Sequence, residues 1–138
     1  MLVQFVIGAA IISVAVVLQG LCIGVATAVQ ARIQRHGRQP TPPHMIGLVI
    51  GVTLWMLTGQ MAGVFVWAGA FQMLGAFADL EDAVYFALVA YTTLGFGDLL
   101  MPEEWRLLGG LVAANGMISF GLATAYMVRF LTAVRTGR

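Results

Sequence analysis

The chain has 138 residues, of which 60% are hydrophobic and only 9% are charged, and its formal net charge is +1. Soluble domains carry about 25% charged residues, so this composition excludes an ordinary soluble domain and indicates a membrane protein. No charged residue occurs in residues 1–31, 39–78 or 107–128. Each window exceeds the roughly 18 to 20 residues that cross a hydrocarbon core. The sequence therefore predicts three membrane-spanning helices.

The first predicted helix covers residues 1–30. A cleaved signal peptide is the alternative, because "ATA" at residues 26–28 is similar to a cleavage site. Against it, the segment has no positive n-region and its apolar run is too long. Cys22 is the only cysteine of the chain, and we expect it to be an inert packing residue.

A linker is expected next, over residues 31–44. Its Arg32, Arg35 and Arg38 recur at every third residue, as the arginines of a voltage sensor do. The sequence "HGRQPTPP" at residues 36–43 breaks a helix, however, so a solvated linker is the favoured interpretation.

Basic and acidic residues are separated along the chain. Six of the seven arginines lie in this linker and in the C-terminal tail. The acidic residues all lie between the second and third predicted helices, where Arg106 is the only basic residue: Asp79, Glu81, Asp82, Asp98, Glu103 and Glu104. The positive-inside rule places the linker and the tail in the cytoplasm. We therefore predict a multi-pass protein of the plasma (inner) membrane with its N-terminus outside.

The second predicted helix covers residues 45–77. Glycine pairs with G-x-x-x-G spacing let helix backbones approach closely in lipid. The first two helices contain three such pairs, which are Gly20 with Gly24, Gly47 with Gly51, and Gly59 with Gly63. We expect these pairs to pack the first helix on the second, and we expect Gln60 to hydrogen-bond to a neighbouring helix.

A short apolar segment, "DLEDAVYFALVAY", predicts a helix over residues 80–91 with Asp79 as its N-cap. Such a helix is about 18 Å long, too short to cross the membrane. The chain must then return through "TTLGFGD" at residues 92–98. At membrane depth, non-helical backbone is tolerated only where it is buried in protein or lines a water-filled path. Gly95 and Gly97 supply positions where a positive φ costs little, so we predict a pore lined by backbone carbonyls.

The stretch "TTLGFGD" resembles the selectivity filter of the potassium-channel pore family, and "NGMISFGLATA" at residues 115–125 is similar to the inner helix of its simple bacterial members. The resemblance covers roughly residues 45 to 132. It implies an all-α membrane protein that forms a homotetramer around a central pore, with the first helix as an addition. The implied pore domain, residues 45–138, consists of an outer helix (45–77), a pore helix (80–91), a filter (92–98) and an inner helix (104–133).

The resemblance also implies roles for individual residues. The filter would consist of Thr92, Thr93, Leu94, Gly95, Phe96 and Gly97, with K⁺ held at Thr93, Leu94, Gly95 and Phe96. Support behind the filter would come from Asp98 and Tyr85, and the outer vestibule would carry Glu103 and Glu104. Gly116 matches the hinge of the inner helix. Helical spacing from Gly116 places Phe120, Thr124 and Val128 near one face, as the cavity wall and inner gate.

Several residues depart from the family pattern without changing the carbonyl ring. These are Leu94 in place of valine or isoleucine, Phe96 in place of tyrosine, Val89 in place of a glutamate, and Tyr85 with Phe86 in place of a tryptophan pair. Phe96 has no hydroxyl and Phe86 has no N–H, so the side-on hydrogen bond of related filters cannot form. We expect the Tyr85 hydroxyl to donate to Asp98 instead.

The predicted function is passive, K⁺-selective conduction across the membrane. A non-selective cation channel and a non-conducting membrane subunit are the alternatives. We expect no enzyme activity, because the predicted spans contain no His, Cys or paired-acid constellation. The expected partners are three further copies of the chain and the lipid bilayer, with no nucleic acid and no cofactor apart from permeant potassium ions.

Overall fold

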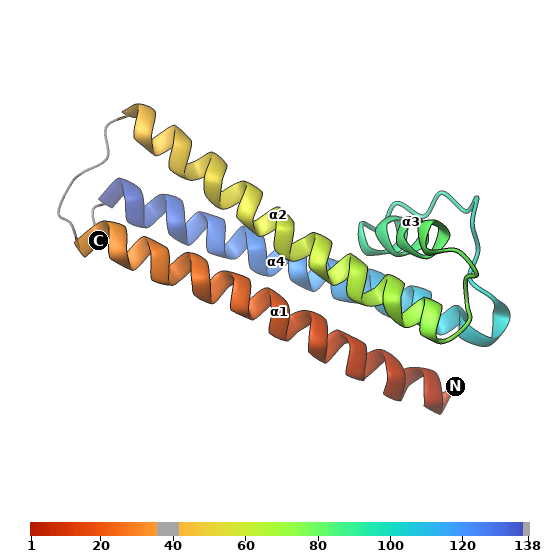
Figure 1. Cartoon of the computed structure of the whole chain (residues 1–138). Coiled ribbons are helices and arrows are strands. Elements are labelled where there is room, and N and C mark those ends of the chain that lie inside the picture. Colours follow the sequence, from red (N-terminus) through yellow and green to blue (C-terminus); the bar gives the residue numbers. More distant parts are fainter. Residues whose placement is uncertain (36–41, 137–138) are drawn as a thin grey trace.

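The computed structural model describes residues 1–35 and 42–136. In chain order its elements are α1 (Leu2–Arg35), α2 (Pro42–Met73), α3 (Leu80–Tyr91), the 3₁₀ turn η1 (Glu103–Trp105) and α4 (Arg106–Thr136). Figure 1 shows three long helices side by side, with α1 and α4 running in one direction and α2 in the other. The short α3 lies at the end where α2 ends and α4 begins. The described residues form no strand, so the predicted all-α class is confirmed.

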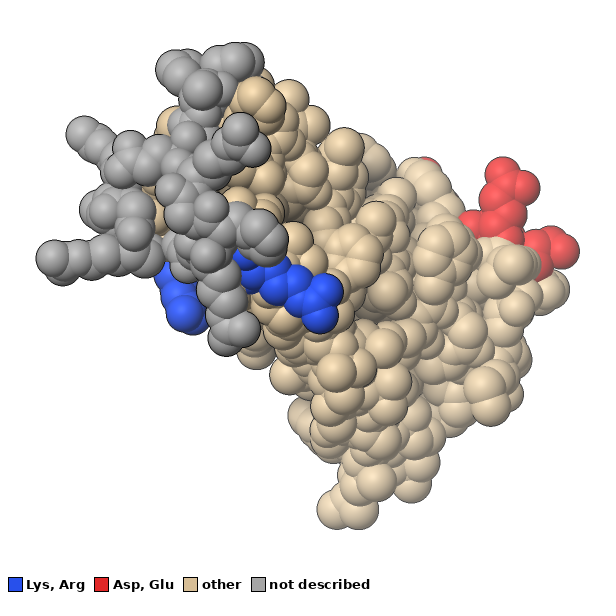
Figure 2. Space-filling view, turned by 60° about the vertical axis from the view of Figure 1, so that its left-hand side comes forward, with Lys and Arg blue, Asp and Glu red and all other residues tan. Residues whose placement is uncertain are grey.

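Within the described residues, three helices are long and apolar enough to cross a membrane, as the sequence predicts: Leu2–Ile33, His44–Met73 and Glu103–Val134. Many of their large apolar side chains are exposed, as expected for helices that face lipid. The acidic residues belong to the segment between α2 and α4, whereas Arg32 and Arg129 lie near the ends of α1 and α4. In Figure 2 the visible acidic and basic side chains lie at opposite ends of the molecule, which we call the acidic end and the basic end.

The helix limits differ from the expected ones at the ends of α1 and α2. The first helix continues to Arg35 and the second begins at Pro42, so part of the expected 31–44 linker is helical. Proline is tolerated at a helix start because its missing N–H has no partner there. Arg38 and the other residues of 36–41 lie outside the described residues.

The second helix ends at Met73 rather than at residue 77. The reason is a helix stop at Gly75, whose φ of 69° is left-handed. The amide of Ala76 donates to the Phe71 carbonyl at 2.9 Å, and that of Gly75 donates to the Gln72 carbonyl at 2.9 Å. These two bonds satisfy carbonyls that the ended helix leaves open.

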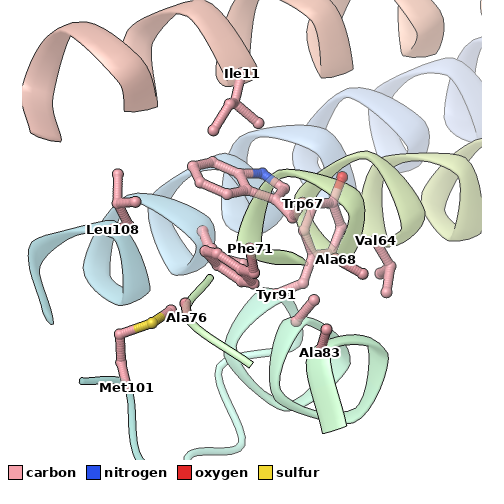
Figure 3. Packing of buried hydrophobic residues seen from close by; sticks show 12 residues of the cluster. Ile11, Val64, Trp67, Ala68, Phe71, Ala76, Ala83, Tyr91, Met101 and Leu108 are labelled. Atoms are coloured by element: carbon pink, nitrogen blue, oxygen red, sulfur yellow. The ribbon is translucent and has the colours of Figure 1, made fainter. Parts of the chain in front are cut away.

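The main core lies at the acidic end, where all four α-helices contribute buried side chains. Trp67 and Phe71 of α2 and Tyr91 of α3 are fully buried there, and Figure 3 shows Ile11 of α1 and Leu108 of α4 beside them. Towards the basic end a second, smaller cluster consists of Ala26, Met56, Tyr126 and Phe130.

Only one of the three glycine pairs lies at a close helix contact. A Cβ on Gly59 would lie 2.9 Å from the Gln19 side-chain oxygen of α1, and a Cβ on Gly63 would lie 2.7 Å from the Tyr91 hydroxyl of α3. The expectation of close packing is wrong for the remaining pairs, which have no atom within 4 Å of a built Cβ: Gly20, Gly24, Gly47 and Gly51.

Candidate functional site

The site begins with α3, whose start carries negative charge. Asp79 occupies the N-cap position in an extended conformation, but its side chain makes no capping hydrogen bond. Glu81 and Asp82 in the first turn still favour the positive end of the helix dipole. Asp79 therefore occupies the predicted N-cap position without a capping hydrogen bond, and the start of α3 is stabilised by negative charge alone.

The position of Tyr91 shows how deep α3 reaches. Its side chain lies against Gly63, ten residues before the end of α2, and its backbone lies against Gly116, ten residues after the start of α4. At 1.5 Å per residue, both helices place the end of α3 about 15 Å from their ends at the acidic end. That is about half of a 30 Å hydrocarbon core, so we expect α3 to stop near mid-depth.

A buried glutamine holds Tyr91 in place. The Gln60 amide of α2 donates to the Ser119 carbonyl of α4 at 3.1 Å, and its oxygen accepts from the Tyr91 hydroxyl at 3.3 Å. Gln60 is 2% exposed, so these bonds replace water in an apolar surrounding. The predicted hydrogen bond from Gln60 to a neighbouring helix is confirmed, and one side chain joins α2, α3 and α4.

The loop that follows turns back towards the acidic end. Its Leu94 amide donates to the Val89 carbonyl at 3.0 Å, which reverses the chain against the last turn of α3. The Thr92 hydroxyl donates to the Leu88 carbonyl at 2.7 Å, so it serves the end of α3. Thr93, at the deep end of the loop, is exposed.

Left-handed residues alternate with ordinary ones along this loop. Gly95 and Gly97 have φ values of 61° and 78°, as their residue type predicts, and Thr93 has a φ of 61°. The left-handed conformation of Thr93 was not expected, because this region favours glycine. Alternation of this kind turns successive carbonyl groups towards the same side of the strand. The alternating φ values are those that the predicted carbonyl-lined path requires.

Tyr85 and Asp98 join the end of the loop to α3. The Tyr85 hydroxyl donates to an Asp98 carboxylate oxygen at 2.5 Å, and Tyr85 lies six residues before the deep end of α3. This hydrogen bond holds the pKa of the Asp98 carboxyl below its usual value and raises the pKa of the Tyr85 hydroxyl. Asp98 is therefore a carboxylate, and Tyr85 a neutral donor, at neutral pH.

Phe86 and Phe96 lie in different surroundings. The Phe86 ring lies 5.7 Å from the Phe71 ring and 5.2 Å from the Phe77 ring, and it reaches the first turns of α4 at Gly109. Phe96 is 67% exposed. Within one chain the aromatic packing therefore fixes α3 to α2 and α4, and it does not reach the Phe96 side chain of the loop.

Glu103 and Glu104 are exposed at the acidic end, beside the start of α4. Arg106 forms a salt bridge to Glu103 at 3.1 Å, and both side chains are largely exposed. Such a surface pair contributes little stability, but it offsets part of the Glu103 charge. Of the two residues expected in the outer vestibule, Glu104 therefore keeps more of its negative charge than Glu103.

The candidate cavity residues of α4 share one uncovered face. Phe120, Thr124 and Val128 are exposed, whereas Tyr126 and Phe130 on the opposite face are buried. Gly116 lies elsewhere, at the contact with α3, where a Cβ would overlap the Tyr91 carbonyl. Close packing is thus a sufficient reason for glycine at this position. Phe120 also contacts the Tyr91 ring edge-on at 5.9 Å between centroids.

Sequence reasoning missed a set of buried polar residues in the spans. They are Gln19 and Gln30 of α1, together with Asn115 and Ser119 of α4. A polar residue within a long apolar run was the available signal, because such groups are costly in lipid and face protein. Among the described residues, no group of three or more His, Cys, Asp or Glu side chains could hold a metal ion.

Together these features define a membrane protein in which two long helices flank a short helix and a loop that turns back at mid-depth. A comparison with protein-family models matches residues 48–133, more than half of the chain, to a family described as ion channel. The chain belongs to this ion channel family, in which the pore is of the potassium-channel type. The searches of curated proteins and of solved structures give no match. Helix α1 lies outside the matched stretch.

Proposed function

We propose that the chain is one subunit of a homotetrameric, K⁺-selective channel that conducts passively across a bacterial-type plasma membrane. Family membership makes it an ion channel, and the choice of K⁺ rests on the loop. The observation that carries the proposal is the alternation of left-handed φ at Thr93, Gly95 and Gly97. Carbonyls that all face one axis can replace the hydration shell of a monovalent cation.

The tetramer follows from what a single chain leaves uncovered. One chain supplies one loop, and a ring of carbonyls needs several. Leu94 and Phe96 are 60% and 67% exposed, although they belong to the loop that returns from the deep end of α3 towards the acidic end. In the proposed tetramer, neighbouring copies cover these side chains and the loop. The uncovered face of α4 with Phe120, Thr124 and Val128 then borders the cavity below the filter.

The separated charges support the proposed orientation. Arginines at the basic end belong in the cytoplasm by the positive-inside rule, so the loop, the N-terminus and the acidic residues lie outside. Four copies of Asp98, Glu103 and Glu104 then concentrate cations at the outer mouth. The negative end of the α3 dipole points towards the cavity, where it favours a waiting cation.

The test is potassium and sodium flux into liposomes that contain purified protein with Gly97 replaced. A Cβ at Gly97 meets nothing within 4 Å in the chain, so Gly97→Ala changes mainly the cost of its left-handed φ of 78°. We expect Gly97→Ala to abolish K⁺ flux in an assembled tetramer. The matched control is D-alanine at position 97, placed by chemical synthesis, because it adds the same methyl group but favours positive φ.

Each outcome discriminates between the functions considered. The selective filter is supported if the parent and the D-alanine protein conduct K⁺ but not Na⁺, and if Gly97→Ala conducts neither ion. Equal K⁺ and Na⁺ flux in the parent identifies a non-selective cation channel. A parent tetramer without flux identifies a non-conducting subunit. Normal flux in Gly97→Ala contradicts the role proposed for the loop backbone.

A further inference from the structure

Helix α1 lies outside the family match, yet three of its glutamines, Gln4, Gln19 and Gln30, are directed at the pore helices. Gln19 and Gln30 are 1% and 9% exposed, and Gln4 is half-buried at the start of the helix. The Ser13 hydroxyl, by contrast, donates to a carbonyl of its own helix. An amide group is costly in lipid unless protein groups surround it. The glutamines therefore mark the face of α1 that is built to contact protein.

The first contact is at the acidic end. The Gln4 amide donates to the Glu104 carbonyl at 2.5 Å, and the Gln4 oxygen accepts from the Leu107 amide at 3.1 Å. The first amides of a helix have no partner within the helix, so Gln4 supplies a cap for α4 from another helix. Close approach at Gly8, where a Cβ would overlap the Leu111 side chain, extends this contact by one turn.

The second contact is towards the basic end. The Tyr126 hydroxyl of α4 donates to the Gln30 oxygen at 3.4 Å, and both residues are buried. Tyr126 belongs to the smaller cluster, with Ala26 of α1 and Met56 of α2. Between the two ends, the Trp55 ring N–H of α2 donates to the Cys22 carbonyl at 2.9 Å, so α1 is tied to α2 as well.

We propose that α1 is a positioning element of the channel, which fixes the start of α4 and favours a position of its cytoplasmic half away from the pore axis through Gln30 and Tyr126. The inference rests on the proposed function in that α4 lines the pore. Thr124 and Val128 lie on the uncovered face of α4, whereas Tyr126 lies on the face covered by α1 and α2. A contact on the covered face pulls the other face back from the axis and widens the pore.

The proposal predicts the sign of the effect. Gln30→Met keeps the length of the side chain but removes the acceptor, and Tyr126→Phe removes the donor. Without the contact the inner helices approach the axis, so the open probability falls. One lost hydrogen bond corresponds to a factor of about five in an equilibrium constant. We therefore expect at least a fivefold fall in each variant and no further fall in the double variant.

Single-channel recording of the full chain in planar bilayers tests this gating effect. Gln30 and Tyr126 touch neither the loop nor the ion, so unitary K⁺ current and the K⁺/Na⁺ permeability ratio should equal those of the parent. Ser13→Ala is the matched control, because the Ser13 hydroxyl bonds only within α1, at 2.7 Å to the Ala9 carbonyl. Unchanged open probability in both Gln30→Met and Tyr126→Phe would overturn the proposal. A fall in unitary current instead would overturn it too.

Amide hydrogen exchange of the protein in lipid nanodiscs tests the positioning role without any ion flux. We expect Gln30→Met to speed exchange in peptides from residues 122–132 and to leave residues 104–112 unchanged. Gln4→Met should have the reverse effect. Hydrogen exchange can test the positioning role even if the parent protein does not conduct. Absence of conduction would contradict the proposed function but not the positioning role of α1. Parent-like exchange in both variants overturns the positioning role of α1.

Discussion

The acidic and basic ends of the bundle are packed differently. At the acidic end, Trp67, Phe71 and Tyr91 are fully buried, and side chains from all four α-helices meet around them. Towards the basic end, the buried cluster consists of Ala26, Met56, Tyr126 and Phe130, and α3 takes no part in it. One end is a four-helix core with several aromatic rings, and the other is a three-helix contact with two.

The difference corresponds to two requirements of the proposed channel. Carbonyl oxygens that select an ion must keep their positions, and the dense core at the acidic end fixes α3, which supports the loop. A gate must change position at low cost, and regions with few buried contacts are the ones that open locally. Packing density thus separates a fixed filter end from a movable gate end.

The largest expected effect compares the two buried phenylalanines. Phe71 contacts the rings of Trp67, Phe77 and Phe86, whereas Phe130 contacts only the Tyr126 ring among the described residues. An aromatic pair contributes about 0.5 to 1.5 kcal/mol beyond its buried area. We expect Phe71→Leu to lower the free energy of unfolding more than Phe130→Leu does, because it loses three ring pairs rather than one while the loss of buried area is similar. Denaturation of the purified protein in detergent measures both, and equal losses would remove the proposed difference between the ends.

The next effect concerns the contact between α4 and the deep end of α3. A Cβ at Gly116 would overlap the Tyr91 carbonyl, and a backbone group cannot rotate away as a side chain can. We expect Gly116→Ala to cost about 1 to 3 kcal/mol of stability, the usual cost of overpacking. It should also impair K⁺ selectivity, because α3 must shift.

Gly110→Ala is the control for this substitution. It lies on the same helix, and its Cβ meets nothing within 4 Å, so alanine should be neutral or stabilising there. Thermal unfolding and liposome flux distinguish the two variants. Equal stability and selectivity of the two would argue against a tight contact at Gly116.

A smaller effect is expected from the bond at the outer end of the loop. Tyr85→Phe deletes only the hydroxyl that donates to Asp98. We expect faster loss of conduction at low K⁺, with selectivity at high K⁺ nearly unchanged, because bound ions then hold the filter in place. Recordings at several external K⁺ concentrations measure this. Parent-like behaviour at every concentration would mean that packing alone holds the filter.

The same bond predicts a dependence on pH. Since the hydrogen bond lowers the pKa of Asp98 below its ordinary value of 3.8, the folded protein binds this proton less readily than the unfolded chain does. The stabilisation is therefore complete above that value and is lost only as the pH falls below it. Because Asp98 stays ionised in this range, we expect its hydrogen bond with Tyr85 to cause no change in the conduction of the parent between pH 8 and pH 5. Tyr85→Phe should move the acid limit upwards, which recordings at stepped external pH can measure.

The smallest effect is expected at the exposed glutamates of the mouth. Glu104→Gln should lower conductance at 0.01 M salt, where charges act over about 30 Å, and have little effect at 1 M, where they act over about 3 Å. Glu103→Gln should do less, because Arg106 already offsets this charge at 3.1 Å. An equal reduction at both salt concentrations would indicate a steric effect rather than electrostatic focusing.

Local features of the site could be predicted from the sequence. The acids before an apolar run indicate the start of α3, and glycine at two alternate positions indicates left-handed backbone at Gly95 and Gly97. The hydrogen bond between Tyr85 and Asp98 was expected from the resemblance, which places Tyr85 behind the filter within reach of Asp98. Each of these inferences uses residues close in sequence, whose geometry depends little on the remaining fold.

Contacts between the long helices could not be predicted in the same way. Lipid-facing and protein-facing sides of a membrane helix are both apolar, so periodicity does not reveal which face packs. For that reason the sequence did not distinguish Gly59, which contacts α1, from Gly20, which contacts nothing. The left-handed φ of Thr93 was missed because its residue type gives no local signal for that conformation.

The depth of Tyr91 has an electrical consequence. In the proposed tetramer, the space on the cytoplasmic side of α3 is a water-filled cavity, and water there stays close to the potential of the cytoplasm. The transmembrane voltage then falls across the outer half alone, about 15 Å rather than the roughly 30 Å of an unbroken hydrocarbon core. The electrical energy of a monovalent ion changes by roughly 2.3 kcal/mol per 100 mV across the whole membrane. Nearly all of this change therefore occurs while the ion passes the loop. The short reach of α3 thus about doubles the electric field on the ion at the place where the proposed filter selects it.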